Sequence, residues 1–200
     1  MHNIALNTSA LAVEAILTES ISVKQSLRER EAKTIAAMAL EIAEGFRKGN
    51  RLFLFGNGGS AADAQHVAAE FVNRFQMDRP PLPAIALTVD ASILTSIGND
   101  FSFNDIFIKQ LQALGQTNDM ALGISTSGRS PNVLKALKWA HRNGLHTYGW
   151  AGADHTDMDS DCQLIIHAPS DVTARVQECH ITIGHAICAL VDKALFGENQ

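Results

Sequence analysis

The stretch that decides the fold runs from Leu52 to Glu70 and reads LFLFGNGGSAADAQHVAAE. Its first four residues are apolar and predict a buried strand, glycines follow in a turn, and the remainder has a helical pattern. We expect Ser60 to cap this helix, because serine is a favoured N-cap residue. The free N–H groups of a first helical turn, together with the helix dipole, favour an anion such as phosphate.

Two reactive side chains follow in the same predicted helix. His66 and Glu70 are four residues apart, so they lie about 40° apart and roughly 6 Å along one face. One loop can therefore hold a phosphate while the next turns present a base and a candidate metal ligand. The residues alone leave alternatives open. The loop also fits a plain tight turn, or the dinucleotide pattern G-x-G-x-x-A through Gly56, Gly58 and Ala61, and the histidine and glutamate also fit a solvated ion pair.

Composition narrows the class of protein. Two hundred residues with 46% hydrophobic content suit one domain over 1–200, with helices over 1–49 used in packing or assembly and a core over 50–200. A net charge of −5 without a basic run argues against a nucleic-acid partner. No leader pattern and no apolar stretch of membrane-spanning length is visible, so we expect a cytoplasmic protein with no membrane partner. The three scattered cysteines suit free thiols.

Along the chain, helical patterns come first and then alternate with strand patterns. The periodicity predicts helices over 10–27 and 31–47, then strands over 51–55, 84–88, 120–124, 146–150 and 163–167, with helices over 60–75, 92–97, 106–113, 132–142 and 172–196. Apolar strands separated by helices indicate an α/β fold with a parallel sheet covered on both faces. In such sheets ligands bind beyond the carboxyl ends of the strands, near a switch in strand order.

A second loop points to the same edge of the sheet. The third strand runs into a cluster of small hydroxyl residues around Gly128, namely Ser125, Thr126, Ser127 and Ser130. Hydroxyl groups beside a helix start can surround a phosphate with neutral donors. A capping turn is the alternative interpretation of such a cluster. Its place beside the glycine loop favours a phosphate site.

The ordered set of motifs resembles the sugar isomerase (SIS) family, and within it the phosphoheptose isomerases. The motifs are GNGGS at 56–60, GNDF at 98–101, ND at 104–105, STSG-x-S at 125–130, and RVQE-x-H at 175–180 with His185 downstream. The similarity covers nearly the whole chain. It implies a three-layer αβα sandwich with a five-stranded parallel sheet, and a homotetramer whose sites neighbouring subunits complete. It implies conversion of D-sedoheptulose 7-phosphate to D-glycero-D-manno-heptose 7-phosphate, towards nucleotide-activated heptose.

The resemblance also implies roles for individual residues, carried over motif by motif. Phosphate would be bound by Ser60, Ser125, Thr126, Ser127 and Ser130, and the sugar by Asn57, Gly58, Gly59, Glu70, Asn99, Asp100 and Gln177. Glu70 would be the catalytic base and His185 the catalytic acid. A zinc ion would be held by His66, Glu70, Gln177 and His185. Spacing alone does not select this chelate, because Gln177 and His185 lie about 80° and 12 Å apart on a helix, and His180 competes.

The implied reaction asks for these groups. Ketose–aldose interconversion moves a proton between C1 and C2 through an enediol, so it needs a base near the carbon-bound hydrogen and an acid near the oxygen. A carboxylate and an imidazole meet both needs, and a zinc ion with nitrogen and oxygen ligands can stabilise developing negative charge. Metal ligation lowers the basicity of a carboxylate, which makes a double role of Glu70 demanding.

Some positions depart from the family pattern, and other functions remain open. Arg129 stands where asparagine is common, residues 148–155 replace an aliphatic strand and turn, and Ala174 replaces an aspartate of some members. The first alternative is an SIS relative that binds a bacterial replication initiator, although such relatives lack the glutamate and final histidine retained here. Another is an isomerase or sensor for a different sugar phosphate. A nucleotide-dependent dehydrogenase with Asp90 on the ribose is the third.

Overall fold

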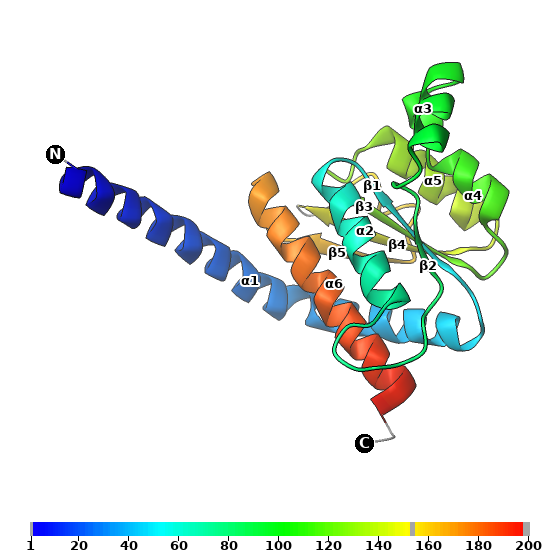
Figure 1. The fold of residues 1–200 in the computed structure, drawn as a ribbon, viewed down its shortest axis with the longest axis horizontal. Coiled ribbons are helices and arrows are strands. Elements are labelled where there is room, and N and C mark those ends of the chain that lie inside the picture. Colours follow the sequence, from blue (N-terminus) through cyan, green and yellow to red (C-terminus); the bar gives the residue numbers. More distant parts are fainter. Residues whose placement is uncertain (1, 153–154, 198–200) are drawn as a thin grey trace.

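A five-stranded parallel sheet forms the middle of the molecule. The computed structural model describes residues 2–152 and 155–197, with side chains from Leu6 onward. The strands are β1 (Leu52–Gly56), β2 (Ala84–Ala86), β3 (Met120–Ser125), β4 (His146–Gly152) and β5 (Leu164–Ala168). They pair in the order β2-β1-β3-β4-β5 (Figure 1). The direction of strand order therefore switches at β1, and the loops after β1 and β3 flank the switch point, where parallel sheets bind ligands.

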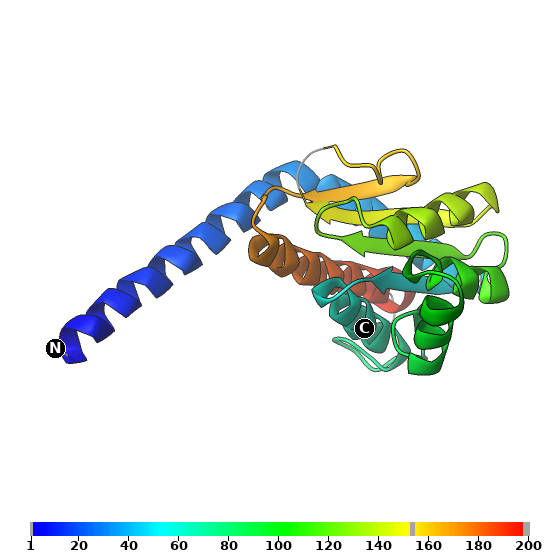
Figure 2. The same ribbon diagram turned by 90° about the horizontal axis from the view of Figure 1, so that it is seen from above.

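Helices cover both faces of the sheet, as predicted. One face carries α1 (His2–Arg47), α2 (Gly59–Val72) and α6 (Thr173–Phe196). The other carries α3 (Ala91–Asp100), a 3-10 turn (Phe103–Asp105), α4 (Ile108–Leu114) and α5 (Pro131–Arg142) (Figure 2). Alternation along β1 places Leu52 and Leu54 in the first core and Phe53 and Phe55 in the second. The prediction of a three-layer αβα sandwich is confirmed.

The N-terminal extension differs from its prediction. A single helix, α1, runs from His2 to Arg47, where the pattern predicted two helices over 10–27 and 31–47. The three residues between those ranges are Arg28, Glu29 and Arg30, which are good helix formers, and no glycine or proline interrupts them. The part after Leu27 packs against the sheet and α6. The part before it extends away from the sheet and contacts the start of α6, where Ser20 donates to Glu178 and the Ile16 carbonyl accepts from Arg175 (Figures 1 and 2).

Other boundaries shift by a few residues. Strand β2 ends at Ala86, two residues short of its prediction, and α2 ends at Val72 rather than at residue 75. Gly98, Asn99 and Asp100, predicted to separate two helices, form the last turn of α3 instead. The predicted helix over 106–113 corresponds to α4, which begins at Ile108 and ends at Leu114, and the 3-10 turn lies just before the predicted range.

Helix α6 is the apolar helix at the centre of the first face. By length and composition alone it could cross a membrane. It packs instead against α1, α2 and the sheet, and it buries Arg175, His180 and Asp192 within the fold. These buried polar side chains identify it as the core helix of this α/β fold.

Candidate active site

The glycine loop turns the chain from β1 into α2. Gly58 has a φ of 55°, a conformation that favours glycine, and α2 begins at the next residue. Ser60 is therefore not the N-cap, contrary to prediction. It is the second helical residue, its side chain is buried, and its N–H donates to the Asn57 carbonyl at 3.0 Å. A Cβ on Gly56 would lie 2.6 Å from the Ile124 carbonyl, so this glycine lets the loop approach β3.

A reciprocal amide pair joins the two loops. Asn57 Nδ2 donates to Asn132 Oδ1 at 2.9 Å, and Asn132 Nδ2 donates to Asn57 Oδ1 at 2.8 Å. Asn132 is buried at the start of α5, just after the serine loop. Asn132 was not predicted as a site residue, because an asparagine at a helix start is ordinarily a local cap. The pair fixes the distance between the two loops.

The hydroxyl groups of the serine loop converge. Ser125 Oγ lies 2.9 Å from Ser130 Oγ and 3.4 Å from Ser127 Oγ. The Arg129 N–H donates to Ser127 Oγ at 3.2 Å, which closes the turn from within. Ser125 is buried at the end of β3, Thr126 is half-buried and Ser127 is exposed. The loop thus presents a cluster of neutral hydroxyls at the carboxyl edge of the sheet.

Two helices bring three potential metal ligands together. His66 Nε2 lies 3.3 Å from Glu70 Oε1 on α2 and 2.9 Å from His185 Nε2 on α6. Ligand atoms of the three residues all lie within 4.8 Å of one another. Gly184 makes this approach possible, because a Cβ there would lie 2.7 Å from Val67 Cγ2 of α2. His66 and Glu70 of α2 therefore lie next to His185 of α6.

Gln177 lies beside the glycine loop. A Cβ added to Gly59 would be 2.2 Å from Gln177 Nε2, so the amide rests directly on that glycine. His180, the competing histidine, is buried and its Nε2 lies 3.2 Å from the Ala151 carbonyl. Burial lowers the pKa of His180 to about 4. It is a neutral core residue in the fold, which removes it from the competition with His185.

One acidic side chain of the site escaped the sequence analysis. Asp63 lies one turn before His66 on α2, and its Oδ2 is buried without a hydrogen-bond partner. Burial raises the pKa of the Asp63 carboxyl to about 6, against a smaller opposing effect of His66. A carboxyl that titrates near neutrality beside a histidine is typical of functional sites. The sequence offered one indication of this: Asp63 is three residues before His66, which places the two side chains on the same face of a helix.

Comparisons with known proteins agree with this geometry. The family model for the SIS domain matches residues 17–152. A phosphoheptose isomerase of Nitratidesulfovibrio vulgaris is 50% identical over 179 residues, covering 90% of this chain and 86% of the relative. One from a Roseiflexus species is 49% identical over 179 residues, covering 90% and 91%. The solved phosphoheptose isomerase of Neisseria gonorrhoeae is 38% identical, with a TM-score of 0.86, covering 92% of this chain and 98% of that one. The chain belongs to the phosphoheptose isomerase family of SIS-domain proteins.

Two residues predicted to bind the sugar lie at the end of α3. Asn99 and Asp100 are exposed at the end of α3, where Asn99 Nδ2 donates to Asp100 Oδ1 at 2.9 Å. Within the described residues, no hydrogen bond joins either of them to the glycine or serine loop. Asp90 caps α3 by accepting a hydrogen bond from the Ile93 N–H at 2.8 Å. A capping role accounts for the aspartate that the dehydrogenase alternative required.

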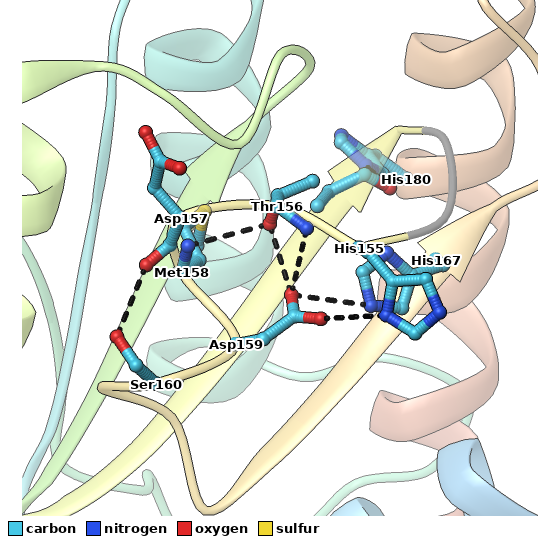
Figure 3. A network of polar contacts seen from close by, with 9 residues as sticks. His155, Thr156, Asp157, Met158, Asp159, Ser160, His167 and His180 are labelled. Atoms are coloured by element: carbon cyan, nitrogen blue, oxygen red, sulfur yellow. Dashed lines mark hydrogen bonds and ion pairs between the residues drawn. The ribbon is translucent and has the colours of Figure 1, made fainter.

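The departures from the phosphoheptose isomerase pattern gather beside the serine loop. A Cβ on Gly128 would lie 2.3 Å from Thr156 Cβ, so the connection after β4 packs directly on that loop. Thr156 donates to Asp159 Oδ1 at 3.0 Å, and Asp159 also faces His155 and His167 (Figure 3). Arg129 and His155 line a pocket of about 240 Å³ together with Thr126, Ser127, Thr156, Ser170, Asp171 and Thr173.

Proposed function

We propose that this chain isomerises D-sedoheptulose 7-phosphate to D-glycero-D-manno-heptose 7-phosphate in the cytoplasm, as an early step towards nucleotide-activated heptose. The observation that supports this most directly is the meeting of Glu70, His66 and His185 next to two loops of phosphate-binding character. One end of the substrate is held by its phosphate, and the other end reaches an acid and a base.

The phosphate is proposed to bind between the glycine and serine loops. The hydroxyls of Ser60, Ser125, Thr126, Ser127 and Ser130, with N–H groups at the starts of α2 and α5, would donate to its oxygens. Asn57, Gly58, Gly59 and Gln177 would contact the sugar. Asn99 and Asp100 stay in the proposal through the motif alone, because their side chains hydrogen-bond to each other and, among the described residues, to neither loop.

The chemistry is a proton transfer within the sugar. Glu70 takes the proton from C1 of the ketose and returns it to C2. His185 delivers a proton to the oxygen on C2 and then takes the proton that the hydroxyl on C1 gives up, so substrate and product balance and His185 regains its proton. Glu70 is only 25% exposed, which limits the water available to exchange with the transferred proton.

A zinc ion fits the donor set at this point. Two imidazole nitrogens and one carboxylate oxygen, from His66, His185 and Glu70, suit zinc, which prefers such ligands in tetrahedral sites. Gln177 would be the fourth ligand. When bound, zinc would stabilise negative charge that develops on the substrate oxygens.

The function is tested by incubating the purified protein with sedoheptulose 7-phosphate in D₂O. We expect the aldose to form, with deuterium at C2 to the extent that the base exchanges with solvent. Ketose phosphates of five and six carbons serve as the comparison. Faster turnover of a shorter substrate would assign the chain to another sugar phosphate, and no turnover of any would favour a binding protein.

The zinc assignment is tested by metal analysis. The wild-type protein should contain about one zinc per chain. His66→Ala should lose it, because a structural or catalytic zinc rarely persists on one fewer ligand. His141→Ala, at an exposed position near the end of α5 on the other face of the sheet, is the matched control and should keep the metal. A fully active protein free of metal would refute the zinc role.

The first part of α1 is proposed to serve assembly. Leu11, Val13, Ile16, Leu17 and Ile21 are each more than half exposed on it. An apolar stripe of that extent is typical of an interaction surface. We propose that residues 1–49 hold a homotetramer together and that residues 50–200 form the catalytic core, with neighbouring subunits completing each site.

A further inference from the structure

A long connection joins α2 to β2. Residues 73–83, here called the return connection, fold back beside α6 before reaching β2 (Figure 1). The connection is pinned by Arg79, whose side chain is 1% exposed. Its guanidinium donates to Asp192 Oδ1 of α6 at 3.0 Å and to the Glu70 carbonyl of α2 at 2.8 Å. The Phe71 carbonyl accepts a further hydrogen bond at 2.5 Å.

This arrangement joins the two helices that carry the acid and the base. The last carbonyls of a helix have no partner within it, and here a guanidinium supplies one. The same guanidinium is paired with α6 through Asp192, whose side chain is also 1% exposed. Removing one partner of such a pair leaves an uncompensated buried charge. The backbone of Glu70 is thereby fixed relative to α6.

Besides the contact between His66 and His185, three contacts join α2 to α6 at successive levels, and they differ in kind. Gly59 meets Gln177 at the first level, and Val67 meets Gly184 at the second. Both are close approaches permitted by a missing Cβ. The third, through Arg79 and Asp192, is a hydrogen-bonded ion pair and is the directional one.

The return connection also touches the acid directly. The ring of Phe75 stacks on the ring of His185 with centroids 5.4 Å apart and planes inclined by 22°. The imidazole of His185 also lies near that of His66, with ring centroids 5.1 Å apart. His185 therefore contacts one ring of the return connection and one ring of α2.

We propose that the return connection, anchored by the Arg79–Asp192 pair and contacting His185 through Phe75, positions the base and the acid relative to each other. Arg79, Asp192 and Phe75 are positioning residues in this proposal, since they act through Glu70 and His185. The catalytic part of this inference rests on the proposed function. The same connection should also position His66, Glu70 and His185 as metal ligands, whether or not the protein is an isomerase.

The test compares Asp192→Asn, Arg79→Lys and Phe75→Leu with wild type, at a temperature where circular dichroism shows each variant folded. We expect kcat to fall at least tenfold, while KM and the affinity for inorganic phosphate stay within about twofold, because misplacing reacting groups affects the chemical step. The affinity of the metal-free protein for zinc should fall at least about tenfold, as with other groups that orient ligands. Asp78→Asn, an exposed residue in the same connection, should change none of these.

The outcomes separate the possible failures. Variants that lose thermal stability but keep kcat and zinc affinity would show a merely structural role and overturn the inference. A wild-type protein without isomerase activity would overturn the proposed function, while the zinc affinities would still decide about positioning. If the buried pair cannot be changed without unfolding, Phe75→Leu decides, because Phe75 is partly exposed.

Discussion

Glu70 has two neighbours that shape what it can do. His66 lies 3.3 Å away on the same helix, and the Glu70 carbonyl is held by Arg79. Glu70→Gln keeps the shape and removes the base, so we expect kcat to fall by about 10² to 10⁴ while phosphate affinity and assembly persist. Steady-state kinetics and calorimetry with inorganic phosphate measure the two effects. Glu44→Gln on α1 is the control, and unchanged turnover in the Glu70 variant would remove the assignment of the base.

Asp63 gives the protein a pH dependence that can be worked out in sign. Its pKa is raised from 3.8 to about 6 on folding, mainly by burial. Between about pH 4 and pH 6 the folded state therefore binds more protons than the unfolded state, and the free energy of unfolding falls as pH rises through this window.

Asp63→Asn should remove that loss of stability. We expect the metal-free variant to exceed wild type by about 1 kcal/mol at pH 7, after allowance for the partial exposure of the group, and to match it below pH 4. Urea unfolding at both pH values measures the difference. A constant difference across the range would mean that the aspartate does not titrate there.

Sequence reasoning located part of the site and missed its partners. The spacing of His66 and Glu70 placed both on one helix face, which the structure bears out. The N-cap was predicted at Ser60 because serine is a common N-cap residue. In the structure Gly58, with its positive φ, is the N-cap, so α2 begins one residue before Ser60. Asn132 and Arg79 could not be found, because the side chains with which they pair, Asn57 and Asp192, lie on elements distant in sequence.

Contact between α2 and α6 depends on one small residue. A methyl group on Gly184 would lie 2.7 Å from Val67 Cγ2 and 3.3 Å from the Trp150 ring. Gly184→Ala should force the helices apart and separate His185 from His66. We expect a loss of about 1 to 3 kcal/mol of stability and a lower kcat. Thermal unfolding and kinetics check this.

Gly98→Ala is the matched control for that substitution. It is also a helical glycine, but a Cβ there meets nothing within 4 Å. Its stability should rise by roughly 0.5 to 1 kcal/mol, as expected when alanine replaces glycine in open helix. Equal losses in both variants would show that helix propensity, and not the contact with α2, governs position 184.

The positions of the strands along the chain were easier to predict than the order in which the strands pair in the sheet. All five strands were predicted within two residues of their ends, because their apolar runs are bounded by glycine, proline and asparagine. The fusion of the two N-terminal helices was not predicted, although no breaker separates them. Sequence also carries no direct information on the pairing order β2-β1-β3-β4-β5, which long-range packing decides.

The first part of α1 carries exposed apolar side chains that do not pack in the hydrophobic core. Helix α1 spans about 69 Å at 1.5 Å per residue, and its first part lies away from the sheet (Figure 1). Replacing Leu17 and Ile21 together by glutamate should weaken assembly, because it places charge in the exposed apolar stripe. Light scattering coupled to size-exclusion chromatography should report a smaller particle.

The control for this substitution lies on the same helix. Ala12→Glu adds charge at an exposed position that lies about 140° from Leu17 and about 180° from Ile21 around the helix at 3.6 residues per turn, and it should leave the particle size unchanged. If subunits complete one another's sites, isomerase activity should fall together with the particle size. A tetramer that survives the double substitution would assign the assembly surface elsewhere.

The distance in sequence between His66 and His185 has a consequence for synthesis on the ribosome. The glycine and serine loops emerge with the first three strands, whereas α6 is made last. In the proposed mechanism the base comes from α2 and the acid from α6, so the acid–base couple is complete only after α6 has been made and has packed on α2.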